Sequence, residues 1–122
     1  MTEPFFFDSY ALIEIAKGSE PYKRYSNYNI VTTRLNLFEL FYILLRDIDE
    51  KTACFAISRF SDFTVDFDNQ TVEDAARFKL LHKKKNLSMT DCIGYFTARK
   101  SGLRFLTGDQ QFEHMLEVEF VH

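Results

Sequence analysis

The stretch Leu87–Asp109, LSMTDCIGYFTARKSGLRFLTGD, decides how the rest of the chain is interpreted. Its first half has apolar residues at helical spacing, and Gly102 is placed as the stop. The run Leu103–Leu106 that follows has the length and composition of a buried strand. The stretch therefore predicts a helix, a glycine turn and a strand, in which Asp91 opens the helix and Asp109 follows the strand.

The overall composition bounds the class of protein. The chain has 122 residues, of which 46% are apolar and 27% are charged, and this fits one globular domain, 1–122, with a single core. No apolar run approaches the ~20 residues of a membrane helix, and the first residues lack the pattern of a secretory signal. Cys54 and Cys92 show neither zinc nor disulfide spacing. We therefore expect a cytoplasmic protein with no membrane partner.

The net charge of −3 hides an uneven distribution. Residues 77–104 hold eight basic residues around a single acid, Asp91, while the remainder of the chain is strongly acidic. This basic segment could bind a phosphate backbone, and Arg99 and Lys100 are the candidates to reach the phosphates of a nucleic acid. The alternative is a solvated helix face whose basic residues interact with the C-terminal end of the helix dipole. Both interpretations stay open at this point.

Strand-like and helix-like segments alternate along the chain. Phe5–Phe7 is a continuous apolar run that is typical of a strand in a parallel sheet. We expect further strands at 29–33, 63–65, 103–106 and 118–121, and helices at 10–16, 34–47, 50–60, 71–84 and 88–101, with a possible short helix in 19–28. The alternation predicts an α/β fold, a three-layer sandwich with a mainly parallel central sheet flanked by helices.

Apolar side chains exceed what one small core can hide. The chain has 14 phenylalanines, and five neighbouring apolar residues of one predicted helix cannot all face the same core. These five are Leu37, Phe38, Phe41, Tyr42 and Leu45. Such a surface predicts self-association, as a homodimer, or contact with a partner.

Two acidic residues accompany the first half of the chain. Asp8 follows the first predicted strand, where parallel α/β sheets bind their ligands, although an N-cap role alone would also explain it. Glu39 stands among apolar residues of a helix, where an unpaired buried carboxylate is costly. It therefore needs a cation or a partner, unless it reaches back to Asn36 or Thr33 at the helix start.

The second pair of acids belongs to the opening stretch. Asp91 stands at the capping-box position after Ser88, and Asp109 sits in a glycine turn, so each has an ordinary structural explanation. Together with Asp8 and Glu39 they indicate more, because strand ends and helix starts can meet at one rim of a parallel sheet. Clustered carboxylates cannot all stay ionised without compensation, which a hard divalent cation supplies. The four acids therefore predict a Mg²⁺ or Mn²⁺ site that hydrolyses phosphodiester bonds by metal-activated water.

At this point the chain resembles the PIN domain family and, within it, the VapC-type toxin endoribonucleases. The matching motifs are FFFDSYALI at 5–13, VTTRLNLFEL at 31–40, the stretch 87–112 and the closing strand 118–121. Each motif is common by itself, but four of them in this order and spacing cover essentially the whole chain.

The resemblance implies the site residues and the activity. The family's acidic metal-binding and catalytic positions fall on Asp8, Glu39, Asp91 and Asp109, and its supporting hydroxyl falls on Thr107. A member of the family would be a Mg²⁺- or Mn²⁺-dependent ribonuclease acting on single-stranded or looped RNA. It would commonly be dimeric and neutralised by a small antitoxin protein. Two departures are Ser9, where threonine is frequent, and Gly94-Tyr95, where small residues are more usual.

Other functions stay open from the sequence alone. The chain could be a stand-alone RNA-processing nuclease, or a non-catalytic binding module that keeps the fold. A receiver domain is disfavoured because its set of acids is missing, and an aspartyl-nucleophile phosphohydrolase because Tyr10 stands where it needs a second aspartate. The three histidines have no motif and are expected to be structural or surface residues: His82, His114 and His122.

Overall fold

A computed structural model describes residues 4–122, and a sheet of four parallel strands forms its centre. The strands are β1 (Phe5–Phe7), β2 (Ile30–Val31), β3 (Arg104–Thr107) and β4 (Val118–Phe120), and their order is β2-β1-β3-β4. Because every pairing is parallel, the carboxyl ends of all four strands lie at one edge of the sheet. Residues that directly follow the strands are therefore brought together.

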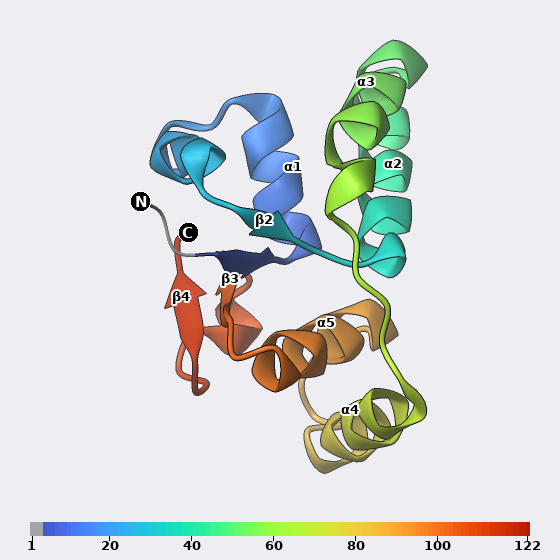
Figure 1. The fold of residues 1–122 in the computed structure, drawn as a ribbon, viewed down its shortest axis with the longest axis vertical. Coiled ribbons are helices and arrows are strands. Elements are labelled where there is room, and N and C mark those ends of the chain that lie inside the picture. The colour runs from blue at the N-terminus through green and yellow to red at the C-terminus, as the bar shows by residue number, and fades with distance from the viewer. Residues whose placement is uncertain (1–3) are drawn as a thin grey trace.

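Helices cover both faces of the sheet, which confirms the predicted three layers. The elements are α1 (Ser9–Lys17), α2 (Arg34–Asp47), α3 (Glu50–Phe60), α4 (Asn69–Leu81) and α5 (Met89–Lys100), with short 3₁₀ helices η1 (Glu20–Asn27), η2 (Ser61–Phe63) and η3 (Gln110–Phe112). Figure 1 shows α1 and the antiparallel pair α2–α3 on one side of the sheet, and α4 and α5 on the other.

Alternate residues of β1 face opposite layers. Phe5 and Phe7 pack into the core under α1 and α2, whereas Phe6 stacks on Phe105 under α5, with ring centroids 5.7 Å apart. A Cβ added to Gly94 would lie 3.1 Å from the Phe6 ring, so a larger residue would push α5 or the ring away from its present position. Gly94 therefore helps to set the distance between α5 and the sheet.

The strand expected at 63–65 is wrong. This segment ends η2 and then makes a single parallel bridge, between Thr64 and Thr32. The bridge consists of the Thr32 N–H donating to the Phe63 carbonyl at 3.0 Å and the Val65 N–H donating to the Thr32 carbonyl at 2.9 Å. Here the chain crosses from the α2–α3 layer to the α4–α5 layer, so it passes the sheet edge without running along it (Figure 1).

The helix expected at 71–84 is real but shifted toward the N-terminus. It begins at Asn69, because the side chain of Asp68 caps it by accepting a hydrogen bond from the Thr71 N–H at 3.0 Å. It ends at Leu81, and the lysines that follow belong to the connection to α5. Among residues 4–122, no helix combines the length and the apolarity needed to cross a membrane.

Candidate active site

Asp91 is fixed at the start of α5 by a complete capping box. The Asp91 N–H donates to the Ser88 hydroxyl at 3.0 Å, and the Ser88 N–H donates to Asp91 Oδ2 at 2.8 Å. The capping role proposed from the sequence is therefore correct. The Asp91 side chain also lines a cavity, so the capping box holds the carboxylate in an orientation in which it can take part in a site there.

Asp8 occupies the N-cap position of α1, but its side chain makes no capping hydrogen bond. It is only 2% exposed, and its Oδ2 accepts a hydrogen bond from the Thr107 hydroxyl at 2.8 Å. Its Oδ1 is buried and has no hydrogen-bond partner in residues 4–122. The capping interpretation therefore does not explain this residue, and a buried carboxylate oxygen without a donor calls for a cation or a proton.

Thr107, the last residue of β3, joins the two acids that follow strands. Its hydroxyl donates to Asp8 and accepts from the Asp109 N–H at 3.1 Å. Asp109 in turn caps η3, since its Oδ1 accepts from the Gln111 N–H at 3.0 Å. The register of the sheet, which pairs Phe7 with Leu106, places Asp8 and Thr107 side by side.

Glu39 projects from the second turn of α2 into the same region and is half-buried. The two residues to which it could have reached back bond to each other instead. The Thr33 hydroxyl donates to Asn36 Oδ1 at 2.6 Å, and the Asn36 N–H donates to the Thr33 hydroxyl at 3.3 Å. Nothing in residues 4–122 forms a hydrogen bond or an ion pair with the Glu39 carboxylate, which therefore faces the cavity.

One cavity of about 440 Å³ collects all four predicted acids. Its lining residues are Asp8, Ser9, Tyr10, Ile13, Phe38, Glu39, Tyr42, Ile43, Asp91 and Asp109. The four acids come from the end of β1, from α2, from the start of α5 and from the end of β3. The parallel topology thus does what the sequence suggested, because these four points share one rim of the sheet.

The carboxylates perturb one another strongly. Burial is the largest cause that raises the pKa of Asp8 well above its ordinary value, and the negative charge of Asp91 raises it further. Burial also raises the pKa of Asp91 to about 6, with added repulsion from Asp109 and Glu39, although the hydrogen bonds from Ser88 oppose this. By itself, the cavity favours a protonated or cation-bound state over a set of free carboxylates.

The donor set fits a hard divalent cation that keeps part of its water shell. No three acidic, histidine or cysteine side chains in residues 4–122 form a ready-made metal cluster. Mg²⁺, however, usually keeps several waters and takes only one or two carboxylates directly. The unpaired Oδ1 of Asp8 is the observation that fits such an ion, since a cation would satisfy it and lower the pKa of its neighbours.

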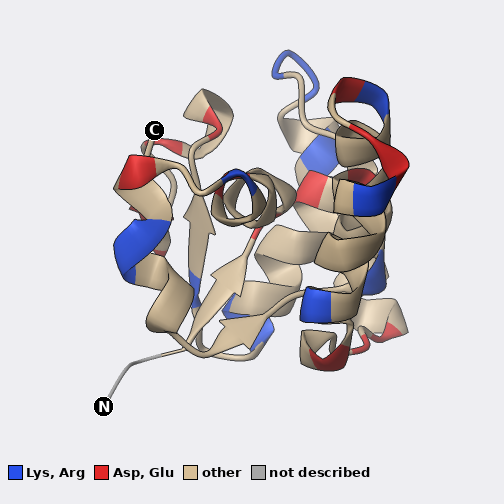
Figure 2. Cartoon of the chain, turned by 90° about the horizontal axis from the view of Figure 1, so that it is seen from above, with Lys and Arg blue, Asp and Glu red and all other residues tan. Residues whose placement is uncertain are grey.

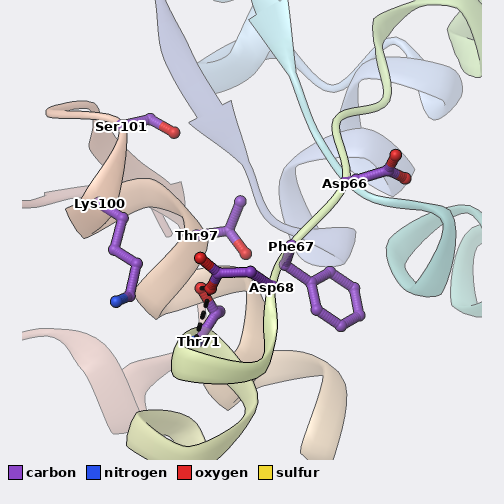
Figure 3. Close-up of a pocket in the computed structure, with 7 residues that line it drawn as sticks. All are labelled: Asp66, Phe67, Asp68, Thr71, Thr97, Lys100 and Ser101. Atoms are coloured by element: carbon purple, nitrogen blue, oxygen red, sulfur yellow. Dashed lines mark hydrogen bonds between the residues drawn. The ribbon is translucent and has the colours of Figure 1, made fainter.

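Arg99 and Lys100 lie at the opposite end of α5 from Asp91, and they do not line the carboxylate cavity. Lys100 pairs with Asp74 of α4 at 3.3 Å and lines a separate cavity of about 310 Å³, drawn in Figure 3. Arg99 donates to the Tyr95 hydroxyl at 3.2 Å. Figure 2 shows basic and acidic segments spread over the helices and connections around a mostly uncharged sheet. An RNA contact by these two residues stays a prediction.

The sequence reasoning missed a buried polar network beside the acids. The Asn36 amide donates to the Ser9 hydroxyl at 2.9 Å, so α1 and α2 are tied together directly behind Asp8 and Glu39. Asn36 lies one turn before Glu39 on α2, and this spacing was the available signal. The sequence also did not place Phe38 and Tyr42 at the cavity, because it indicated only that they belong to a surface for self-association or a partner.

Gly108 is needed where β3 leaves the sheet. A Cβ at this position would lie 2.3 Å from the Tyr10 ring and 2.5 Å from the Val121 carbonyl oxygen, so any side chain would collide with both. The Gly108 carbonyl is also within 2.9 Å of the His122 ring nitrogen Nδ1. The glycine therefore lets the turn that carries Asp109 pack tightly against α1 and the segment after β4.

The fold and the site define a class: three-layer α/β proteins with an acidic cavity at the carboxyl edge of a parallel sheet. A sequence model of the PIN domain matches residues 5–117. The chain therefore belongs to the PIN domain family, whose members are nucleases. A comparison with curated proteins found no match.

Solved structures with similar folds include toxins of VapBC systems. VapC20 of Mycobacterium tuberculosis, a toxin that cleaves the sarcin–ricin loop, has a TM-score of 0.80 and 20% identity over 97% of this chain and 99% of that chain. A toxin–antitoxin complex from Klebsiella pneumoniae gives 0.73 and 18%, over 94% and 95% of the two chains. The DNA-bound VapBC from Salmonella typhimurium gives 0.71 and 19%, over 98% and 97%. At these identities the likeness shows the fold.

Proposed function

We propose that this protein is an endoribonuclease that depends on Mg²⁺ or Mn²⁺, and that it is the toxin of a type II toxin–antitoxin pair. The observation that carries the proposal is the meeting of four carboxylates around one cavity, together with the buried, unpaired Oδ1 of Asp8. Membership of a nuclease family supports the hydrolytic activity. The similarity to VapC and VapBC structures supports the role as a toxin.

The acids have different tasks in this proposal. Asp8 and Asp91 hold the ion, because burial disfavours their charged forms until a cation compensates them. Glu39 and Asp109 complete the negative rim, from α2 and from the end of β3. When bound, the ion supplies an activated water and neutralises charge on the phosphate. Thr107 keeps the Asp8 carboxylate oriented toward the cavity by holding its Oδ2.

The protein partners belong to the same proposal. The Klebsiella and Salmonella structures are toxin–antitoxin assemblies, which supports a small antitoxin as a partner of this chain. The exposed apolar residues outside the cavity, among them Leu80, Leu81 and Phe55, support further protein contacts, including a homodimer. Expression alone should arrest growth, and a small protein encoded beside this gene should relieve the arrest. A stand-alone RNA-processing nuclease would not need such a partner.

RNA cleavage with defined metals tests the activity directly. The wild type should cleave single-stranded RNA in Mg²⁺ or Mn²⁺ and lose this activity in chelator. Asp8→Asn should be inactive, because the amide removes a charge that the ion needs. Glu50→Gln is the matched control: it also neutralises one acid, but on an exposed first turn of α3 that does not line the cavity.

Two results would overturn the proposed activity. One is cleavage that persists in chelator after repeated purification, and the other is full activity of Asp8→Asn. A non-catalytic module predicts in addition that metal leaves the melting temperature unchanged. A shift with Mn²⁺ that is lost in Asp91→Asn would count against that alternative.

A further inference from the structure

Besides the carboxylates, the cavity is lined by two exposed aromatic residues of α2, Phe38 and Tyr42, which we call the aromatic wall. Phe38 is 72% exposed and Tyr42 is 53% exposed, although both line the cavity. They lie four residues apart, so their rings project from the same face of the helix and flank Glu39. Large rings left open to water beside an acidic site are unfavourable unless something covers them.

The exposed apolar residues of this region differ in chemical type according to whether they line the cavity. Along this face of α2 and at its C-cap, the exposed apolar residues are Leu35, Phe38, Tyr42, Leu45 and Ile48. The two that line the cavity, Phe38 and Tyr42, are aromatic, and the three that do not line it are aliphatic. An apolar protein surface would pack against either type, whereas flat rings are the groups on which nucleobases stack.

The position of the wall matches a nucleotide whose phosphate lies at the acids. Phe38 and Glu39 are consecutive residues that line the same cavity, so an occupant that reaches the carboxylate also meets the ring. At about 440 Å³ the cavity is within the range of ~300–1,000 Å³ that small-ligand sites occupy. The Arg46 guanidinium lies 5.6 Å from the centre of the Tyr42 ring and is held by Asp47 at 2.7 and 3.0 Å. This contact restrains the ring and places positive charge beside it.

We propose that Phe38 and Tyr42 stack against the bases of the RNA strand next to the phosphate that is cleaved. The inference rests on the proposed function and adds the residues that select its substrate. A base can reach these rings only if it is unpaired and turned away from its neighbours. The wall therefore discriminates against duplex RNA and contributes to substrate binding rather than to bond cleavage.

Four variants test this inference, with the wild type as reference. Phe38→Leu and Tyr42→Leu keep an apolar side chain but remove the ring. Phe38→Trp changes the side chain but keeps an aromatic ring at this position. Phe55→Leu is the matched control, because Phe55 is also 72% exposed but lies on α3 outside the cavity. Thermal melting and gel filtration of each variant check the fold and the oligomeric state.

Cleavage kinetics and base fluorescence are the readouts. Stacking contributes about 1–3 kcal/mol per base, so each Leu variant should raise KM about fivefold or more and change kcat much less. Phe55→Leu should keep the wild-type KM, and Phe38→Trp should recover most of the substrate binding that Phe38→Leu loses. A single-stranded oligoribonucleotide that contains 2-aminopurine, mixed with the protein in chelator, should change its fluorescence on binding. This change should be smaller with Phe38→Leu.

The outcomes separate the inference from the proposed function. If the wild type cleaves RNA and both Leu variants keep its KM, the stacking role is wrong while the nuclease stands. If Phe38→Leu disrupts the oligomer or the binding of a protein partner and leaves KM unchanged, the wall is a protein interface and the inference is also wrong. If the wild type cleaves no RNA but still alters 2-aminopurine fluorescence through Phe38, the nuclease proposal fails and the stacking surface stands.

Discussion

The two ends of α5 carry two acidic cavities that differ in how their acids are satisfied. At the N-terminal end, Asp91 and Asp8 are largely buried, and one oxygen of Asp8 has no partner in the described residues. At the C-terminal end, Asp68 accepts hydrogen bonds from the backbone and the hydroxyl of Thr71, both at 3.0 Å, and Lys100 is close by (Figure 3). One cavity leaves its charge uncompensated, and the other compensates it internally.

The pKa values follow this difference in opposite directions. Burial and neighbouring acids raise the pKa of Asp8 and Asp91, whereas hydrogen bonds from Thr71, assisted by Lys100, lower the pKa of Asp68. An acid with a lowered pKa stabilises the fold when ionised, and an acid with a raised pKa destabilises it. The comparison therefore identifies Asp68 as a structural cap, whereas the N-terminal cavity holds acids whose charge destabilises the fold, as the proposed binding of a cation requires.

The largest expected effect is that of Asp8→Asn. Changes to groups that only support a metal ligand already cost about 10–100-fold, so the loss of Asp8, which we propose to hold the ion, should lower kcat/KM more than 100-fold. The same change should raise the melting temperature in chelator, because it removes a buried charge. The measurements are RNA cleavage and thermal unfolding with and without Mn²⁺. A variant that is both inactive and less stable in chelator would show that Asp8 is a structural acid like Asp68.

The next largest effect is a pH-dependent difference in the free energy of unfolding between the wild type and Asp91→Asn. Its folded pKa of about 6 lies above the ordinary value of 3.8. Between these values the unfolded chain has lost the proton that the folded chain keeps, so stability falls as pH rises through this window. Above pH 6, Asp91→Asn should be more stable than the wild type by up to about 3 kcal/mol in chelator.

Denaturant unfolding of both proteins between pH 4 and pH 8 measures this difference. Mn²⁺ should remove most of it, since metal and proton compete for the same carboxylate. A difference that grows as the pH falls would mean that the capping box lowers the Asp91 pKa, which contradicts a pKa raised by burial.

The sequence could predict those features of the site that depend on residues close together in the chain, but not those that depend on long-range contacts. The capping box of Asp91 was predictable because its partner Ser88 is three residues away, and caps are local. The bond from Thr107 to Asp8 spans 99 residues and depends on the register of β1 and β3, which no local pattern encodes. The expected strand at 63–65 failed for a related reason, because its residue types suit a strand but its path offers only one pairing partner.

Thr107→Val should have an intermediate effect, on both activity and stability. The hydroxyl is buried and serves Asp8 and the Asp109 N–H, so its removal leaves two polar groups unpaired at a cost of about 1–3 kcal/mol. It should lower kcat/KM about 10–100-fold, with metal affinity reduced in parallel. Thr107→Ser keeps the hydroxyl and is the control. If Val and Ser behave alike, the hydroxyl does not position the acids.

Asp68→Ala should affect stability alone. The N-cap of α4 is lost, and Thr71 loses the partner of its buried hydroxyl, so the free energy of unfolding should fall modestly. RNA cleavage should stay at the wild-type level, because this cavity lies at the other end of α5. Urea unfolding with Asp68→Ser, which can still cap the helix, provides the comparison. A loss of activity larger than the loss of folded protein would mean that the two cavities are not independent.

The smallest effect is expected from Lys100→Gln, and it decides between the two interpretations of the basic segment. Lys100 pairs with Asp74 and sits at the C-terminal end of α5, so its loss should cost less than about 1 kcal/mol and leave KM for RNA unchanged.

Lys84→Gln is the contrasting variant, because Lys84 lies in the connection just before α5. Its neighbour Lys85 donates to the Gln111 carbonyl at 3.1 Å, close in sequence to Asp109. If that connection holds phosphates, Lys84→Gln should raise KM and lower the salt dependence of binding by about one ion. The reverse result would place the RNA path along the C-terminal end of α5.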